Sequence, residues 1–402
     1  MTKILQDAYI VAATRSAVGR APRGALRNTR PDDLLAHVIR SAIAQAPGLD
    51  ASTIEDAVIG CARPEGAQGL NVARIAVLLA GLPQSVAGVT INRFCASGLS
   101  AISMAANRIR TGEADVMIAG GTESMSQVPM SGFAPSFSPD IFLRDEDIGI
   151  AYGMGLTAEK VAKQWNVSRE DQDAFALLSH QRALLAQAAG EFNDEISPID
   201  IVSRSVDFSV NAEGEPSVRS RTFSTDEGPR TDTSLDALGK LRPVFAARGS
   251  VTAGNSSQTS DGAAVLILAS ERAVREQGLT PLARFVSYAV KGVAPEVMGI
   301  GPKEAVPAAL RAAGLAQDQL EWIELNEAFA AQSLAVMRDL GLDPSRVNPL
   351  GGAIALGHPL GATGAIRAAT LIHGLRRRGL KYGMVTMCVG TGMGAAGVFE
   401  RV

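Results

Sequence analysis

Residues 86–119 read VAGVTINRFCASGLSAISMAANRIRTGEADVMIA, and this stretch decides the fold class. The apolar run 86–91 predicts a buried strand, residues 97–111 predict a helix, and residues 114–119 predict a further strand. A strand, a helix and a second strand in succession favour a layered α/β fold. Cys95 stands at the junction between the first strand and the helix.

The same alternation extends toward the N-terminus. Residues 8–14 and 57–60 predict strands, and residues 31–45 and 71–80 predict helices. Residues 123–245 then interrupt the pattern, and we interpret them as an excursion inserted into one α/β domain. The excursion holds a Met-, Ser- and Pro-rich run at 125–140, an amphipathic helical part at 157–190 with a cap-like SRED at 168–171, and a polar segment at 203–233.

A strand at 263–269 resumes the alternation, and a second α/β pattern begins near residue 280. It predicts strands at 281–289, 321–325, 382–388 and 395–400, and helices at 302–314, 328–340 and 361–379. CASGLS at 95–100 and HPLGAT at 358–363 both open a helix that leads into an apolar strand. This predicts a duplicated half, with the two reactive residues meeting across a pseudo-twofold axis.

Composition excludes several classes of protein. The 402 residues carry a net charge of −3, which gives no general case for binding nucleic acid or an anionic membrane. Three cysteines without a framework favour a reducing compartment, and no CxxC or HxxxH spacing predicts a metal site. The first ten residues lack a secretory signal, and no apolar run is long enough for a membrane span. We therefore expect a cytoplasmic protein.

Cys95 is a candidate nucleophile. The N-terminus of the following helix would lower its thiol pKa and raise the fraction of thiolate. The alternative is a buried structural cysteine, and this segment by itself leaves both interpretations open.

Three further residues fall at strand ends beside glycines. His358 lies in NPLGGAIALGHPLGATG at 348–364, and Cys388 opens CVGTGMG, whose N–H groups could form an oxyanion hole. Asn326 in ELNEAFA follows a strand, where its amide could hold a water or the imidazole. The alternatives are a turn histidine, a phosphate cradle or plain turn after Cys388, and a helix N-cap at Asn326. Two thiols and a base together suit acyl transfer.

Several motifs resemble those of thiolases, in order and over nearly the whole chain: NRFCASGLSAI, GGTESMS, TAGNSSQTSDGAA, NEAFA, GGAIALGHPLGATG and CVGTGMG. The resemblance implies a thiolase fold, with two similar α/β halves in five αβαβα layers and a loop domain covering coenzyme A. We expect an N-terminal half at 1–122 and 246–272, a loop domain at 123–245 and a C-terminal half at 273–402.

The resemblance also implies site roles. Cys95 would accept the acyl group, His358 would activate it, Cys388 would move the proton at the α-carbon, Asn326 would fix an oxyanion-hole water, and the Gly390 N–H would complete a second hole with that of Cys95. Coenzyme A and acetyl-CoA are implied as substrates, with no permanent cofactor and no metal. The coenzyme A positions would be Arg230, Leu241, Ala253, Ser257, Phe329 and Met154. Ala237 replaces a serine often found near the nucleotide.

Two departures bear on the subgroup. Residues 152–155 read YGMG and lack the histidine of many acetoacetyl-specific thiolases, and Thr391 replaces a common glycine. Both resemble the degradative 3-ketoacyl-CoA group, so we expect an acetyl-CoA C-acyltransferase of fatty acid β-oxidation. The alternatives are the acetoacetyl-CoA-specific biosynthetic type, a decarboxylating ketoacyl synthase, or a non-catalytic acyl-CoA- or lipid-binding protein. GLNVAR at 69–74 resembles a subunit-contact motif, so we expect a homodimer or homotetramer.

Overall fold

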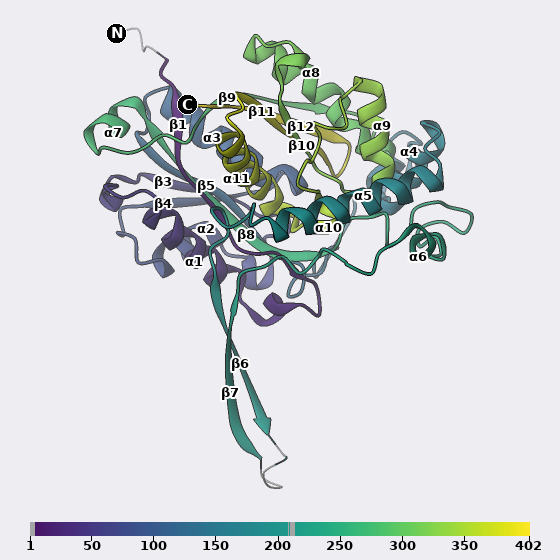
Figure 1. The fold of residues 1–402 in the computed structure, drawn as a ribbon, viewed down its shortest axis with the longest axis horizontal. Helices are drawn as coiled ribbons and strands as arrows, with labels where there is room; N and C mark the ends of the chain where they lie inside the picture. The colour runs from purple at the N-terminus through teal and green to yellow at the C-terminus, as the bar shows by residue number, and fades with distance from the viewer. Residues whose placement is uncertain (1–4, 208, 210–213) are drawn as a thin grey trace.

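The computed structural model describes residues 5–207, 209 and 214–402 (Figure 1). Within this part of the chain, one ten-stranded sheet has the order β10-β11-β12-β9-β1-β8-β5-β3-β4, with β2 beside β8. Its strands are β1 (Ala8–Arg15), β2 (Gly19–Arg20), β3 (Asp56–Gly60), β4 (Ala87–Ile91), β5 (Val116–Ser124), β8 (Ser260–Ser270), β9 (Ala283–Gly292), β10 (Trp322–Leu325), β11 (Tyr382–Val389) and β12 (Met393–Arg401).

The two halves of this sheet repeat one order. The N-terminal half runs β4-β3-β5-β8-β1, and the C-terminal half runs β10-β11-β12-β9. Val347 pairs in parallel with Ile323 of β10, just as β4 pairs in parallel with β3, which completes the match. The halves join where Tyr9 and Ile10 of β1 meet β9. The predicted duplication is therefore confirmed.

The helices complete five layers. Helices α1 (Pro31–Ala44) and α2 (Val72–Leu79) cover the outer face of the N-terminal half, and α8 (Gly301–Ala313) and α9 (Ala330–Leu340) cover that of the C-terminal half. Helices α3 (Ser97–Arg110) and α11 (Leu360–Arg378) fill the layer between the halves. The shorter helices are α7 (Glu271–Glu276) and α10 (Ala353–Leu356).

Glycines let the two central helices approach closely. A Cβ atom on Gly98 would lie 2.8 Å from the backbone nitrogen of Ala365, and one on Gly364 would collide with the backbone nitrogen of Leu99. Larger side chains at these positions would force α3 and α11 apart. This contact matters for function because Cys95 and His358 each stand just before one of these helices.

The prediction that residues 86–91 form a buried strand is wrong in its burial. β4 begins at Ala87 and is largely exposed or half-exposed, because it lies at the edge of the sheet. A short apolar run predicts a strand but does not distinguish a central strand from an edge strand.

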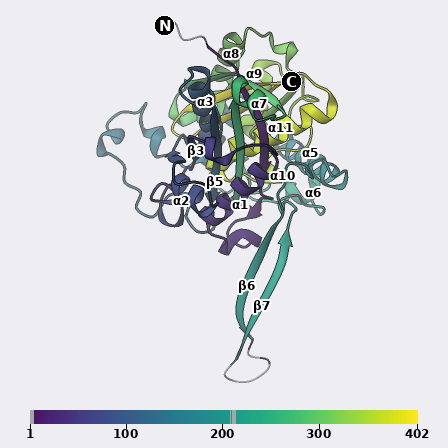
Figure 2. The same ribbon diagram turned by 90° about the vertical axis from the view of Figure 1, so that its left-hand side faces the viewer.

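The inserted segment contains more regular structure than its polarity predicted. The helical part is two helices, α4 (Met154–Gln164) and α5 (Arg169–Ala188), and the Ser168 side chain caps the second by accepting the Asp171 N–H. The polar segment forms a hairpin, β6 (Ile199–Asp207) and β7 (Glu215–Phe223), which projects far from the body (Figure 2). Residues 208 and 210–213 of that segment, and 1–4 of the first ten residues, lie outside the described residues.

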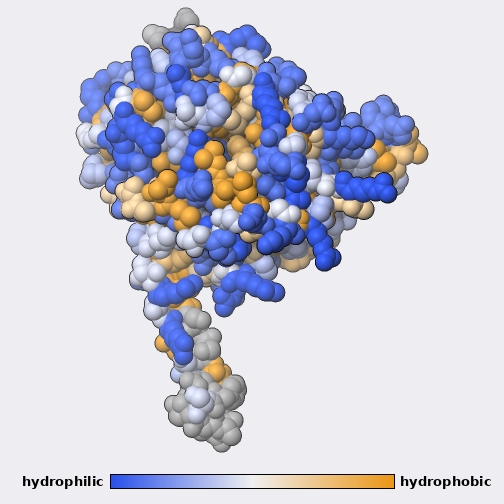
Figure 3. Space-filling view, turned by 45° about the vertical axis from the view of Figure 1, so that its right-hand side comes forward, coloured by the Kyte–Doolittle hydropathy of each residue, from blue (hydrophilic) through white to orange (hydrophobic). Residues whose placement is uncertain are grey.

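The surface of the body carries both hydrophobic and hydrophilic residues. Figure 3 shows hydrophobic residues gathered in the middle of one face, surrounded by hydrophilic ones. None of the helices in the described ranges combines the length and apolarity that crossing a bilayer requires.

Candidate active site

Cys95 lies in a 3₁₀ turn, Phe94–Ala96, between β4 and α3. The turn packs against both α11 and the end of β11. The sulfur faces two backbone N–H groups, its own and that of Gly390. Phe94 has a left-handed φ of 44°, which is rare for a side chain of this size and turns the chain sharply before the cysteine.

The Cys95 thiol is neutral in this buried setting. Burial raises its pKa to about 12, and the two N–H groups offset this only in part. The expected net lowering of this pKa is therefore wrong, because burial outweighs the effect of the N–H groups. Because the resting group is a thiol, a neighbouring base must remove its proton before the sulfur can attack.

Cys388 lies near the end of β11 and is fully buried. Burial raises its thiol pKa, and a thiolate formed at Cys95 would raise it further, because the two sulfurs are close enough to interact. This residue therefore also rests as a thiol, the form that can donate a proton.

His358 stands between α10 and α11 and is held from two sides. Its backbone N–H donates to the Gln258 carbonyl and to Ser260 Oγ, both at 3.2 Å. Its Nδ1 lies 2.6 Å from Thr363 Oγ1. Burial, with a smaller effect of the positive charge of Arg367, lowers its pKa to about 3. The imidazole is therefore neutral and able to accept a proton.

Asn326 follows β10, and its Nδ2 lies 3.3 Å from His358 Nε2. The helix N-cap interpretation of Asn326 is excluded, because the N-cap of α9 is Phe329. Its Oδ1 is buried and has no hydrogen-bond partner among the described residues. A buried acceptor of this kind is available to a water or a ligand.

Four of the six predicted coenzyme A residues line one cavity of about 540 Å³: Arg230, Leu241, Ala253 and Ser257. Ala237, in the short helix α6 (Leu235–Gly239), lines it as well. Met154 and Phe329 do not line it; both pack in the apolar cluster that contains Cys388. The Phe329 ring meets the ring of Phe245, a cavity residue, edge to face at 6.0 Å. Phe329 thus contacts a residue of the cavity and belongs to the same apolar cluster as Cys388.

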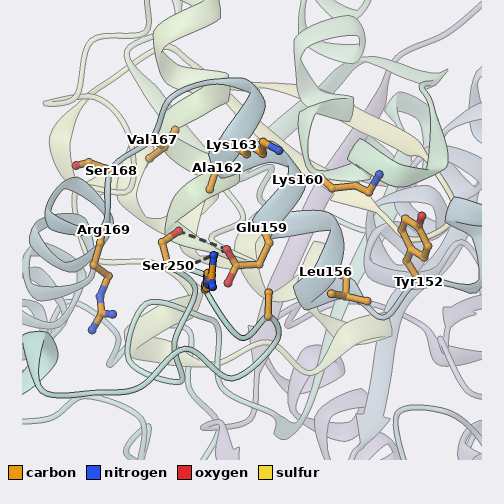
Figure 4. A pocket seen from close by; sticks show the side chains of 13 residues that line it. Tyr152, Leu156, Glu159, Lys160, Ala162, Lys163, Val167, Ser168, Arg169 and Ser250 are labelled. Carbon is orange, nitrogen blue, oxygen red and sulfur yellow. Dashed lines mark hydrogen bonds between the residues drawn. The ribbon is translucent and has the colours of Figure 1, made fainter.

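A second cavity, of about 650 Å³, lies between α4 and residues 246–250 (Figure 4). It is lined by none of the predicted site residues. Glu159 points into this region and accepts the N–H groups of Ser250 and Val251, both at 2.9 Å. The residues that line these two cavities include four of the predicted coenzyme A positions at the first and none at the second, and neither lining includes Cys95, His358 or Cys388.

Two residues of the site were missed from the sequence. Thr363 lies five residues after His358, in the first turn of α11, and this spacing is the only signal that its hydroxyl contacts the imidazole. Glu123 is buried and accepts the N–H groups of Ala62 at 2.7 Å and Gly361 at 2.8 Å. It thereby ties the start of α11 to the end of β3, and its place in GGTES was a usable signal.

This fold and site define an acyl-transferring enzyme, and comparison with known proteins gives the family. The family model "Thiolase, N-terminal domain" matches residues 8–272, and "Thiolase, C-terminal domain" matches residues 279–401. The chain belongs to the thiolase family.

Individual relatives are similar over their full length. A 3-ketoacyl-CoA thiolase of Bacillus subtilis is 50% identical over 396 residues, which cover 98% of this chain and 100% of that protein. A Bacillus anthracis acetyl-CoA acetyltransferase structure has a TM-score of 0.89 at 39% identity, covering 100% of both chains. The human mitochondrial 3-ketoacyl-CoA thiolase structure has a TM-score of 0.87 at 39% identity, covering 99% of this chain and 100% of that one.

Proposed function

We propose that the protein is an acetyl-CoA C-acyltransferase, a 3-ketoacyl-CoA thiolase. It cleaves a 3-ketoacyl-CoA with free coenzyme A to acetyl-CoA and a shortened acyl-CoA. The observation that carries the proposal is the setting of Cys95, whose sulfur meets two backbone N–H groups beside a second buried thiol. The 50% identity to the Bacillus subtilis 3-ketoacyl-CoA thiolase supports the degradative subgroup.

In the first half-reaction, His358 accepts the proton of the Cys95 thiol and the sulfur attacks the 3-keto carbon. The resulting oxyanion is stabilised by hydrogen-bond donors, either a water held by Asn326 or the N–H groups of Cys95 and Gly390. The bond between the α-carbon and the keto carbon breaks, and its electrons form the enolate of acetyl-CoA. Cys388 donates its proton to that α-carbon, and acetyl-CoA leaves.

In the second half-reaction, the thiol of free coenzyme A gives its proton to Cys388 and attacks the acyl group on Cys95. The acyl–sulfur bond to Cys95 breaks, and the departing sulfur recovers the proton held by His358. The N–H groups of Cys95 and Gly390, which face the Cys95 sulfur, would donate to the oxyanion of this step. All steps reverse for condensation.

Coenzyme A would lie in the 540 Å³ cavity. Arg230 at its rim is a cation for the nucleotide end, although it now pairs with Asp232 at 3.0 Å. Ser257 would contact the pantetheine; its N–H donates to the carbonyl of Ala328, which precedes Phe329 in the chain. The thiol end then passes Phe329 toward Cys95.

The proposal is tested by mass spectrometry and by thiolysis rates over a series of 3-ketoacyl-CoA chain lengths. Incubation with acetyl-CoA should acetylate Cys95 in the wild type and leave the Cys95→Ser variant without a thioester and inactive. Cys61→Ser is the matched control, because Cys61 is also a buried free thiol and the proposed steps give it no role. Acylation of another residue, or full activity of Cys95→Ser, would refute the mechanism. Activity confined to acetoacetyl-CoA would instead favour the biosynthetic type.

The assembly and location belong to the same proposal. A homodimer or homotetramer is supported by the edge position of β4 and by Leu70, which is 94% exposed in a motif resembling a subunit contact. We place the protein in the cytoplasm and divide it into halves at 1–122 with 246–272 and at 273–402, with the loop domain at 123–245 between them. Light scattering of the purified protein tests the oligomeric state.

A further inference from the structure

Gln332 is a buried polar residue next to Cys388 that the steps above do not use. It lies on α9 and is fully buried, and one corner of its side-chain amide is 3.6 Å from Cys388 Sγ. A buried amide has four hydrogen-bonding positions to satisfy, so its neighbours determine which end faces the sulfur.

The hydrogen bonds favour the amide nitrogen at this corner. With oxygen there, Oε1 faces the backbone carbonyl of Asn326, which is also an acceptor. With the amide reversed, Nε2 donates to the Asn326 carbonyl at 3.2 Å and Oε1 accepts the Ser333 N–H at 2.9 Å. The reversed arrangement pairs both ends of the amide and directs an N–H toward the sulfur of Cys388.

A donor in this position changes what Cys388 can do. If the amide oxygen faced the sulfur, the S–H bond would point at Gln332 and away from the substrate. With nitrogen there, the thiol proton is free to point at the substrate. When that proton has left, the amide N–H stabilises the negative sulfur, since hydrogen bonds to charged groups are stronger than neutral ones.

No cation in the described part of the chain stabilises the Cys388 thiolate. Among the described residues, none forms an ion pair or a charge-assisted hydrogen bond with Cys388, and burial together with Cys95 raises the pKa of its thiol. The amide of Gln332 is the polar side chain that contacts this sulfur in the described part of the chain.

We propose that Gln332 is a positioning residue of the carbon–carbon bond step, whose Nε2 stabilises the Cys388 thiolate. In cleavage, the S–H bond of Cys388 breaks, the proton bonds to the α-carbon of the acetyl-CoA enolate, and the sulfur keeps the electron pair beside Gln332. In condensation the proton returns to the sulfur. The same Nε2 holds the backbone of Asn326, whose side chain contacts His358. The inference rests on the proposed function.

Two measurements separate a role at Cys388 from a general one. Alkylation of Cys95 by iodoacetamide, followed by mass spectrometry, requires only that His358 take the proton of that thiol and does not use Cys388. Exchange of the α-hydrogens of acetyl-CoA with deuterated water requires Cys388 to take up and return a proton. An effect on Cys388 alone therefore slows the hydrogen exchange and spares the alkylation.

The experiment compares the wild type with Gln332→Glu and Gln332→Met. Glutamate keeps the shape of the side chain and, when ionised, replaces the donor by a negative charge; methionine keeps the length and removes the donor. We expect α-hydrogen exchange and the kcat of thiolysis to fall about tenfold or more, by the size of one hydrogen bond to a charged group. The rate of Cys95 alkylation and the KM for acetyl-CoA should stay within about twofold.

Gln172→Met is the matched control. Gln172 is another fully buried glutamine, on α5, and its Nε2 donates to Ser250 Oγ at 2.9 Å and to the Val167 carbonyl at 3.2 Å. Its loss should leave the ratio of the alkylation and hydrogen-exchange rates unchanged, even if the protein melts at a lower temperature. Equal loss of both rates in the folded Gln332 variants, or loss of neither, would overturn the role of Gln332. Absence of acetyl transfer from acetyl-CoA to labelled free coenzyme A in the wild type would overturn the proposed function instead.

Discussion

The Nδ2 atom of Asn326 lies 3.3 Å from Nε2 of His358, in a buried part of the site. An amide N–H donates to a ring nitrogen only if that nitrogen carries no proton. Nε2 is then the acceptor, and the proton of the neutral ring lies on Nδ1, which donates to Thr363 Oγ1 at 2.6 Å. The Asn326 amide thus selects the tautomer whose free nitrogen can take a proton from Cys95, and the Thr363 hydroxyl, which can donate or accept, accommodates it.

Replacing Asn326 with aspartate should disable this base while keeping the shape of the side chain. A carboxylate cannot donate to Nε2, and its negative charge would raise the lowered pKa of His358 and favour the protonated ring. We expect kcat for thiolysis to fall by about 10²–10³, the usual effect of losing one polar group of an oxyanion site. Steady-state kinetics checks this, with the melting temperature as the control for folding. Near wild-type turnover in Asn326→Asp would contradict the assigned tautomer.

Thr363→Val should misorient the imidazole. Valine has the shape of threonine but lacks the oxygen that accepts the Nδ1–H, so the ring loses the contact that fixes its tautomer. We expect kcat to fall about tenfold to a hundredfold, as for other groups that orient a functional histidine. Thr363→Ser keeps the hydroxyl and should retain most activity. If both variants were equally slow, packing of the methyl group rather than the hydrogen bond would be the cause.

The sequence predicted the alternation of strands and helices and the strand-end setting of Cys95, His358 and Cys388, because period and glycine content are local properties. It did not predict the edge position of β4 or the β6–β7 hairpin, because partners in a sheet are distant in the chain and polar strands lack an apolar period. The lowered pKa expected for Cys95 failed for a similar reason. A helix N-terminus is visible in sequence, whereas burial by α11 and β11 is a tertiary property.

The contact between the central helices gives a prediction about packing. In Gly364→Ala, the new methyl group would meet the backbone of Leu99, which cannot move without separating α3 from α11. We expect a loss of about 1–3 kcal/mol in the free energy of unfolding, with lower activity because Cys95 and His358 precede these helices. Gly239→Ala, where a Cβ meets nothing within 4 Å, should cost nothing or stabilise slightly. Equal stability of the two variants in urea denaturation would argue against the close packing.

Arg15 should be one of the most important residues for stability. It is buried and bonds Glu195 through Nε at 2.7 Å and Asp226 through Nη1 at 2.8 Å. Arg15→Met leaves two carboxylates buried without a cation, which typically costs about 3–5 kcal/mol. Arg144→Met, which removes an exposed ion pair with Asp147 at 3.8 Å, should cost less than about 1 kcal/mol. Urea denaturation followed by circular dichroism measures both, and similar midpoints would refute the difference.

Acid should destabilise the protein through His180, which lines the proposed coenzyme A cavity. Burial, and then the positive charges of Arg230 and Arg20, lower its pKa from 6.5 to about 4. Between pH 6.5 and 4 the unfolded chain takes up a proton that the folded chain does not, so this contribution to stability is complete above pH 6.5 and is lost as the pH falls. The loss from this residue reaches up to about 3 kcal/mol near pH 4.

His180→Asn removes the titration and keeps an acceptor for the backbone N–H of Arg230, which now donates to His180 Nδ1 at 3.2 Å. The variant should therefore lose less stability than the wild type between pH 6.5 and 4, while the two proteins keep a constant difference above pH 7. Urea denaturation at a series of pH values measures the effect, and it cancels the shared contribution of His358, whose pKa is lowered in both proteins. Parallel curves over the acid range would mean that His180 is protonated in the folded state, and that its cavity is more open to water than its burial indicates.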